Sequence, residues 1–181
     1  MMTRTITAMF LASTLIVGCH SSGPKPTTAG QRLDSSNAAS NALAGFRRDA
    51  NAAKFFDSAY AWVVFPKITK GAVGLGVASG SGEVYRGGEM VGYATVTSVT
   101  VGAQLGGQTF SEIIFFQNSF AFDKFTNDQL VGQASAGAVA GESGGLNMAD
   151  YNHGVAIFTR NNSGLIVAAD VGGQKFEYEA K

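Results

Sequence analysis

The sequence is poor in the residues that form disulfides and metal sites. Its 181 residues include one cysteine, Cys19, and two histidines, His20 and His153. A lone cysteine excludes a disulfide within the chain. With so few thiol and imidazole ligands we expect no metal site, and nothing in the sequence indicates another cofactor.

Charged residues are also scarce, and their signs balance. Thirteen basic and 13 acidic residues give a formal charge of zero, and charged residues make up 14% of the chain. A neutral chain gives no electrostatic reason to expect nucleic acid as a partner. The 45% share of apolar residues allows a sizeable core, so disorder throughout is excluded and one domain is expected.

Glycine is abundant instead, with 24 positions. This is well above the usual share of roughly 7% and favours a turn-rich β protein over a helical bundle. In the central stretch, an aromatic and β-branched strand from Tyr60 to Phe65 is followed by Pro66 and two lysines. Because proline cannot donate a ladder hydrogen bond, we expect pairing to lapse at Pro66, with Lys67 and Lys70 on a short connection.

The glycine-rich run that follows has the period of a strand. Small residues recur at every second position from Ala72 to Ala78, and valine or leucine stands between them. A nearly bare face lets another backbone or a bulky aromatic side chain approach closely, or marks a tightly curved sheet. We expect aromatic residues of the preceding strand to help fill that space.

The N-terminus has the form of a signal sequence. Arg4 gives a minimal positive region, and Ile6 to Val17 is apolar but too short to span a bilayer. It ends in Leu15-Ile16-Val17-Gly18-Cys19, which resembles the bacterial lipobox, whose cysteine is acylated and becomes the first residue of the mature lipoprotein. We therefore expect a lipoprotein signal peptide over residues 1–18 and lipidation at Cys19; a plain secretory signal is the alternative.

The residues after the lipobox predict where the protein lies. The second residue of the mature lipoprotein would be His20 rather than aspartate. The resemblance to bacterial lipoproteins then implies passage to the outer membrane rather than retention at the inner one, with the domain facing the periplasm. Residues 19–32 have the composition of a flexible tether. A folded domain over residues 33–181 would then be held next to the bilayer.

Helical periodicity begins at Asp34, a plausible cap. An apolar face follows, made of Ala39, Leu43, Phe46 and Ala50. Ala52 to Phe56 either continues this helix or begins a second one. A basic amphipathic helix of this kind lies on a membrane or covers a sheet.

The rest of the chain reads mainly as strands. Asn118 resembles a cap for a short helix from Ser119 to Phe125, with Phe122 and Phe125 facing the core. Strands are expected at Met90 to Thr97, Val99 to Leu105, Phe110 to Phe116, Gly154 to Thr159, Gly164 to Val171 and around Phe176 and Tyr178. The pattern predicts an α+β domain in which N-terminal helices pack on a strongly curved or barrel-like antiparallel β-sheet.

Charge is unevenly distributed along the chain. From Arg47 to Arg86 there are six cations and three anions, a net charge of +3, whereas Gly87 to Lys181 has four cations and nine anions, a net charge of −5. This asymmetry would orient the domain against an anionic surface, unless it is ordinary scatter.

Three stretches carry a family resemblance. They are AYAWVVFPKITKGAVGLGVASGSGEVY, VTVGAQLGGQTFSEIIFF with the NSFAFDKF segment, and the terminal GLIVAADVGGQKFE. From about Ala42 to the end, the chain resembles the SYLF domain family, lipid-binding domains of eukaryotic actin-patch proteins and bacterial envelope lipoproteins. The resemblance implies an α+β domain that binds anionic phospholipids through a basic surface near its N-terminal part. The actin binding of eukaryotic members does not carry over to a periplasm.

One constellation suggests catalysis. Gly141-Glu142-Ser143-Gly144-Gly145 matches the Gly-x-Ser-x-Gly elbow, and Asp150 and His153 follow in the order of a hydrolase triad. The elbow needs a helix after the serine, yet the following residues have no helical period and many breakers. We therefore expect a glycine-rich loop and no enzyme activity, with a Ser143 esterase as an alternative.

The expected function is non-enzymatic binding of anionic phospholipid at the periplasmic membrane surface. The cations expected to contact phosphate are Lys67 and Lys70 first, with Arg86, Arg47, Arg48 and Lys54 in support. The aromatic side chains of Trp62, Phe55 and Phe56 are expected in the core rather than in the bilayer. A structural envelope protein whose only lipid contact is its acyl anchor is the alternative.

Overall fold

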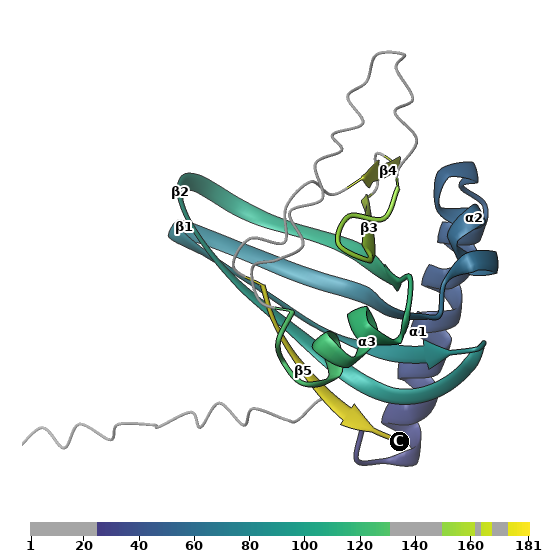
Figure 1. Cartoon of the computed structure of the whole chain (residues 1–181). Helices are drawn as coiled ribbons and strands as arrows, with labels where there is room; N and C mark the ends of the chain where they lie inside the picture. Colours follow the sequence, from purple (N-terminus) through teal and green to yellow (C-terminus); the bar gives the residue numbers. More distant parts are fainter. Residues whose placement is uncertain (1–24, 131–149, 162–163, 168–173) are drawn as a thin grey trace, which may run out of the picture.

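The computed structural model of the chain describes residues 25–130, 150–161, 164–167 and 174–181 (Figure 1). The helices are α1 (Ala29–Arg47), α2 (Ala50–Ser58) and α3 (Ser119–Thr126). The strands are β1 (Ala61–Arg86), β2 (Glu89–Phe116), β3 (Val155–Asn161), β4 (Gly164–Val167) and β5 (Gln174–Ala180).

The described strands form one antiparallel sheet dominated by the long β1–β2 hairpin. Strand β2 pairs with β1 over nearly its whole length, with β3 near its C-terminal end and with β5 near its N-terminal end. Strand β4 extends the sheet beyond β3. The hairpin bends so that its two halves lie over each other (Figure 1). The predicted α+β fold with a strongly curved sheet is confirmed, and the described sheet is curled and open rather than closed into a barrel.

Glycines let the two halves of β1 approach each other. A Cβ at Gly80 would lie 2.6 Å from the Lys67 carbonyl oxygen, and one at Gly82 would overlap the Val64 carbonyl oxygen and the ring of Phe65. The small-residue period therefore serves close backbone approach, as expected, with Phe65 as the aromatic neighbour. The approach occurs at Gly80 and Gly82, in the same alternation as the predicted run but beyond its last residue.

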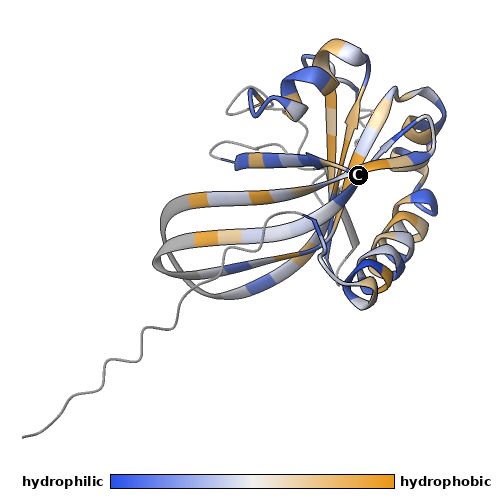
Figure 2. Ribbon diagram, turned by 90° about the horizontal axis from the view of Figure 1, so that it is seen from below, coloured by the Kyte–Doolittle hydropathy of each residue, from blue (hydrophilic) through white to orange (hydrophobic). Residues whose placement is uncertain are grey.

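The core has two parts, one on each face of the β1–β2 hairpin. Inside the curl, strand residues such as Val63, Ile114 and Phe176 pack with the aromatic side chains of α3. On the outer face, α1 and α2 cover a second cluster that includes Trp62 and Phe115. Figure 2 shows hydrophobic residues gathered in the strand segments next to the helices.

Individual aromatic predictions also hold. Trp62, Phe55 and Phe56 are buried, at 5%, 3% and 8% exposure. Helix α3 begins after Asn118, whose side-chain oxygen accepts a hydrogen bond from the Ala121 amide, and it buries Phe122 and Phe125. In the part of the chain that the structure describes, no helix is both long and apolar enough to cross a membrane.

The first helix starts earlier than predicted. Thr28, rather than Asp34, is its cap, and Thr28 and Gln31 form a reciprocal capping box. The helix therefore takes in residues 29–32 of the expected tether. The question left open for Ala52 to Phe56 is settled in favour of a second helix, because Asp49 caps α2 through the Asn51 amide.

The prediction that Lys67 and Lys70 lie on a connection between strands is wrong. Strand β1 runs through Pro66, and only the register changes: Phe65 pairs with Glu112 and Ile68 with Phe110. Two residues of β1 thus face one residue of β2, which is a β-bulge. A bulge accommodates the missing N–H of proline without ending the strand.

Candidate functional site

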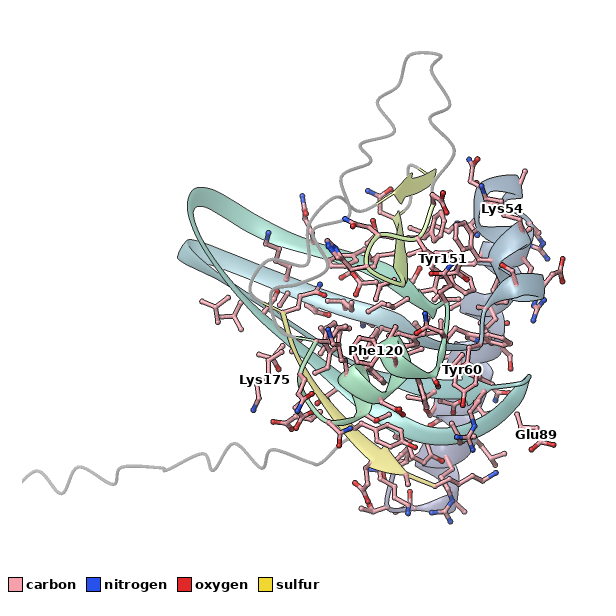
Figure 3. All side chains as sticks on the ribbon, in the orientation of Figure 1. Lys54, Tyr60, Glu89, Phe120, Tyr151 and Lys175 are labelled. Carbon is pink, nitrogen blue, oxygen red and sulfur yellow. The ribbon has the colours of Figure 1, made fainter. Side chains whose placement is uncertain are left out.

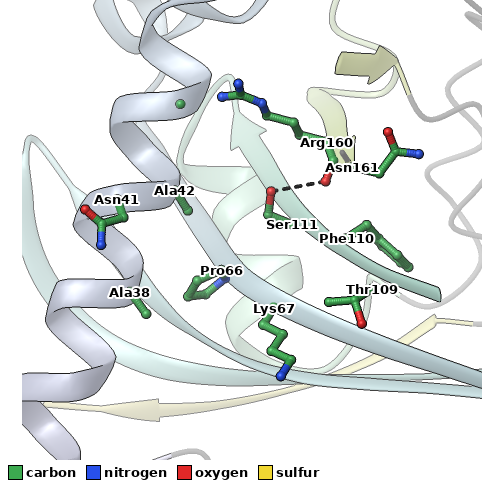
Figure 4. A pocket seen from close by; sticks show the side chains of 11 residues that line it. Ala38, Asn41, Ala42, Pro66, Lys67, Thr109, Phe110, Ser111, Arg160 and Asn161 are labelled. Atoms are coloured by element: carbon green, nitrogen blue, oxygen red, sulfur yellow. Dashed lines mark hydrogen bonds between the residues drawn. The ribbon is translucent and has the colours of Figure 1, made fainter. Parts of the chain in front are cut away.

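A groove lies between α1 and the outer face of the sheet (Figure 4). Its volume is about 470 Å³, and its walls come from α1, β1, β2 and β3. The residues that line it are Ala38, Asn41, Ala42, Gly45, Pro66, Lys67, Thr109, Phe110, Ser111, Arg160 and Asn161. Two of these described residues are cations, and none of them is an aspartate or glutamate.

Strand pairing brings the two cations to the same groove. Ser111 of β2 pairs with Arg160 of β3 on one side and faces the Pro66–Lys67 bulge of β1 on the other. Since neighbouring strands lie about 4.8 Å apart, the backbones of Lys67 and Arg160 are roughly 10 Å apart, with Ser111 between them. The Ser111 hydroxyl donates a hydrogen bond of 3.3 Å to the Arg160 carbonyl oxygen.

Arg160 rests against helix α1 at Gly45. A Cβ on Gly45 would overlap the Arg160 guanidinium. Glycine inside a helix costs about 1 kcal/mol relative to alanine, so this position gives up helix stability where it makes space for the arginine.

Among the residues that the structure describes, no carboxylate neutralises either cation of the groove. Within the described residues, the ion pair found is Lys175 with Glu177, at 3.0 Å on the surface, and neither Lys67 nor Arg160 has an ion-pair partner. Both side chains are exposed. The groove is therefore a place of positive potential bordered by hydroxyl and amide groups, which suits an anion.

Two other predicted site residues lie over aromatic rings of the outer core. The Arg47 guanidinium carbon is 3.9 Å from the centroid of the Phe56 ring, and the Lys54 ammonium is 5.2 Å from that of Phe55. These cation–π contacts are structural. Arg48 is exposed at the junction between α1 and α2. Since Gly45 touches Arg160, the end of α1 with Arg47 and Arg48 adjoins the Arg160 end of the groove.

Lys70 and Arg86 do not join this surface. By strand alternation Lys70 shares the inner face with Ile68, opposite the groove. Arg86 stands at the hairpin turn opposite Glu89, six residues beyond Gly80, and is therefore about 20 Å along the strand from the contact with Lys67. Figure 3 shows Glu89 at this hairpin end and Lys54 on α2, well apart. The six predicted cations thus do not form one site.

A buried carboxylate ties α1 to the sheet. Glu83 accepts a hydrogen bond of 3.1 Å from the Ser35 hydroxyl of α1 and one of 2.7 Å from the Tyr85 hydroxyl. Burial, together with this bond to Glu83, raises the pKa of Tyr85 far above its ordinary value. The link holds α1 to the second half of β1, while the groove lies against the first half.

A second buried carboxyl group lies inside the curl. Glu112 is 1% exposed, and its Oε2 accepts a hydrogen bond of 3.4 Å from the side-chain nitrogen of Gln174; among the described residues, Glu112 Oε1 and Gln174 Oε1 have no hydrogen-bond partner. Burial raises the pKa of Glu112 to about 7, and the Gln174 bond opposes that rise. A proton on Glu112 would supply the donor that these two oxygens lack.

One member of the suggested triad, Ser143, lies outside the described residues, and so does the predicted lipidation site Cys19. Asp150 accepts a hydrogen bond from its neighbour, the Tyr151 amide, at 2.7 Å. His153 is exposed in a tight turn, where it and Gly154 have φ values of 51° and 81°.

Arg160 is the residue that sequence reasoning missed. It stands two residues after the buried Phe158 in a strand that ends in turn residues, and nothing local marks it as functional. Only the pairing of β3 with β2 places it beside Ser111 and across from Lys67.

Comparison with known proteins gives one distant relative. No family model matches the chain. The chain is 29% identical over 132 residues to Beta cell expansion factor A of Aeromonas veronii. The match covers 72% of this chain and 50% of that protein, so the chain spans about half the length of the curated relative it matches.

Proposed function

We propose that this protein binds anionic phospholipids at a membrane surface without catalysing a reaction. The observation that carries the proposal is the groove under α1. Among the described residues, Lys67 and Arg160 lack ion-pair partners there, and no acidic residue lines the wall. Charge-assisted hydrogen bonds from arginine and lysine are the strong contacts in phosphate recognition. The resemblance of the sequence to the SYLF family points to the same ligand class.

Two further cations next to the groove indicate which side of the domain faces the membrane. Arg47 and Arg48 lie at the end of α1 that carries Gly45, and Gly45 touches Arg160. Each cation near an anionic bilayer contributes about 1 kcal/mol to binding, and the effect fades within a Debye length. We therefore propose that this corner of the domain faces the headgroups.

The protein would be held at this surface by an acyl chain on Cys19, on the periplasmic side of the outer membrane. The sequence from Leu15 to Cys19 supports acylation, because the cysteine directly follows an apolar segment and a small residue. Replacing Cys19 with serine should abolish labelling by a fatty-acid probe and release the protein from membranes. Undiminished labelling of the variant would refute the anchor.

The experiment that tests lipid binding uses the mature chain produced without its acyl group. It should sediment with vesicles that contain anionic phospholipid, bind neutral vesicles poorly, and dissociate as the salt concentration rises. Binding that ignores both headgroup and salt, or no binding, would favour a structural envelope protein whose lipid contact is only its anchor.

A further inference from the structure

The two cations of the groove stand at opposite ends of it. Figure 4 shows Arg160 reaching toward α1, Lys67 extending away from it, and Ser111 between them. Their backbones are roughly 10 Å apart across two strand spacings. A single phosphate that accepts hydrogen bonds of about 2.8 Å from one cation would reach the other only if both side chains turned inward.

In the part that the structure describes, the middle of the groove is uncharged and partly polar. The hydroxyl of Ser111 lies between the cations, with the amide of Asn41 on the α1 side, and Thr109 lines the groove beyond Lys67 (Figure 4). The Ser111 hydroxyl, whose proton goes to the Arg160 carbonyl oxygen, can accept a hydrogen bond from a linker hydroxyl, and the Asn41 amide can donate one. The volume of about 470 Å³ is that of a site for a small molecule rather than for one ion.

We propose that the groove binds a ligand with two phosphate groups joined by a short polar linker, one phosphate at Arg160 and the other at Lys67. The linker lies over Ser111. A lipid headgroup of this chemistry is that of diphosphatidylglycerol, in which a glycerol joins two phosphates. If the ligand is a lipid, this specificity rests on the proposed function. A soluble molecule with two phosphates would offer the groove the same chemistry.

Gly45 determines where the Arg160 end of the site lies. A Cβ there would displace the guanidinium, whose flexible side chain moves at low cost, while the helix backbone gains stability. Gly45→Ala therefore changes the site without weakening the fold, which makes it a useful probe beside the charge variants.

The test compares vesicles with diphosphatidylglycerol and vesicles with twice as much phosphatidylglycerol, so that the phosphate charge is equal. The unlipidated mature chain should bind the first about tenfold more tightly, since one additional charge-assisted hydrogen bond is worth roughly that factor. Lys67→Gln, Arg160→Gln and Gly45→Ala should each reduce this preference severalfold. Lys175→Gln, which removes the same charge from a surface ion pair, should leave the preference unchanged.

A soluble arm separates the sources of the ligand. Glycerol 1,3-bisphosphate, titrated into the same protein and followed by NMR, should bind more tightly than inorganic phosphate and should shift signals of Lys67 and Arg160. Binding of the bisphosphate without any vesicle binding would support the site with a soluble ligand and refute the membrane function.

The outcomes that overturn the site are distinct from those that overturn the function. Equal binding to both vesicle types, with no preference for the bisphosphate, would refute the two-phosphate site and leave the binding of anionic membranes standing. Thermal melts of each variant show whether the fold is intact. No binding of vesicles or of bisphosphate by the folded parent would refute both.

Discussion

At the scale of single residues, the direction in which a side chain leaves its strand decides whether its charge reaches the groove. The bulge at Pro66–Lys67 leaves Lys67 on the outer face, where it lines the groove, whereas Lys70 shares the inner face with Ile68. Both lysines were predictable from the sequence as candidates for phosphate contact, because cations beside a proline in a strand-rich segment are conspicuous. Their separation onto two faces follows from strand alternation once β1 continues through Pro66, but which face each takes depends on the bulge, and the sequence did not indicate it.

The two lysines should therefore differ in effect. Lys67→Gln should weaken binding to anionic vesicles by about fivefold, the equivalent of about 1 kcal/mol for one cation at the surface. Lys70→Gln should change it by less than about twofold, because that side chain faces away from the proposed contact surface. Co-sedimentation at fixed salt measures both, and equal losses would contradict the assignment of faces.

Glu112 makes stability depend on pH. Its pKa is raised from 4.5 to about 7 in the folded protein, so between these values the folded state holds a proton that the unfolded state has lost. Stability falls as pH rises through this window, and the loss is complete above about pH 7. A shift of this size corresponds to about 3 kcal/mol.

The variant Glu112→Gln isolates this effect. An amide at position 112 keeps the shape, can donate to Gln174 and does not ionise. Its free energy of unfolding in urea should exceed that of the parent by about 2–3 kcal/mol at pH 8, and the two should converge toward pH 5. Parallel pH profiles for parent and variant would show that Glu112 is not the group responsible.

At the scale of elements, the β1–β2 hairpin depends on glycine where it crosses itself. The period-two pattern of small residues predicted close approach, and this holds at Gly80 and Gly82. The sequence could not say which glycines meet the other half, because that depends on where the long ladder bends. For the same reason two strands of 26 and 28 residues were expected as several shorter ones.

Adding a methyl group tests this crossing. Gly82→Ala should destabilise the fold by about 1–3 kcal/mol, as expected for overpacking against backbone, since its Cβ would overlap the Val64 carbonyl oxygen. Gly71→Ala is the control, because a Cβ there meets nothing within 4 Å. Urea unfolding measures both, and equal stability of the two variants would contradict the stacked arrangement.

At the scale of the whole molecule, charge gathers where separate elements meet. The groove takes Lys67 from β1 and Arg160 from β3, and α1 forms its far wall. The net positive charge from Arg47 to Arg86 indicated the right part of the chain, yet Arg160 comes from the acidic remainder. Local sequence predicted the helices, the strand-rich middle and the buried aromatics, whereas the site required the pairing of β2 with β3.

The most direct test of the central claim is the affinity of the double variant Lys67→Glu, Arg160→Glu for anionic vesicles, measured by co-sedimentation without the acyl anchor. Two cations are worth about 2 kcal/mol, near thirtyfold in partitioning, and their reversal should exceed that. Lys175→Glu with Lys181→Glu carries the same change in charge outside the groove and should retain most binding. The groove variant should lose nearly all binding and keep its thermal melt; a folded groove variant that sediments as well as the parent would show that the groove is not the lipid site.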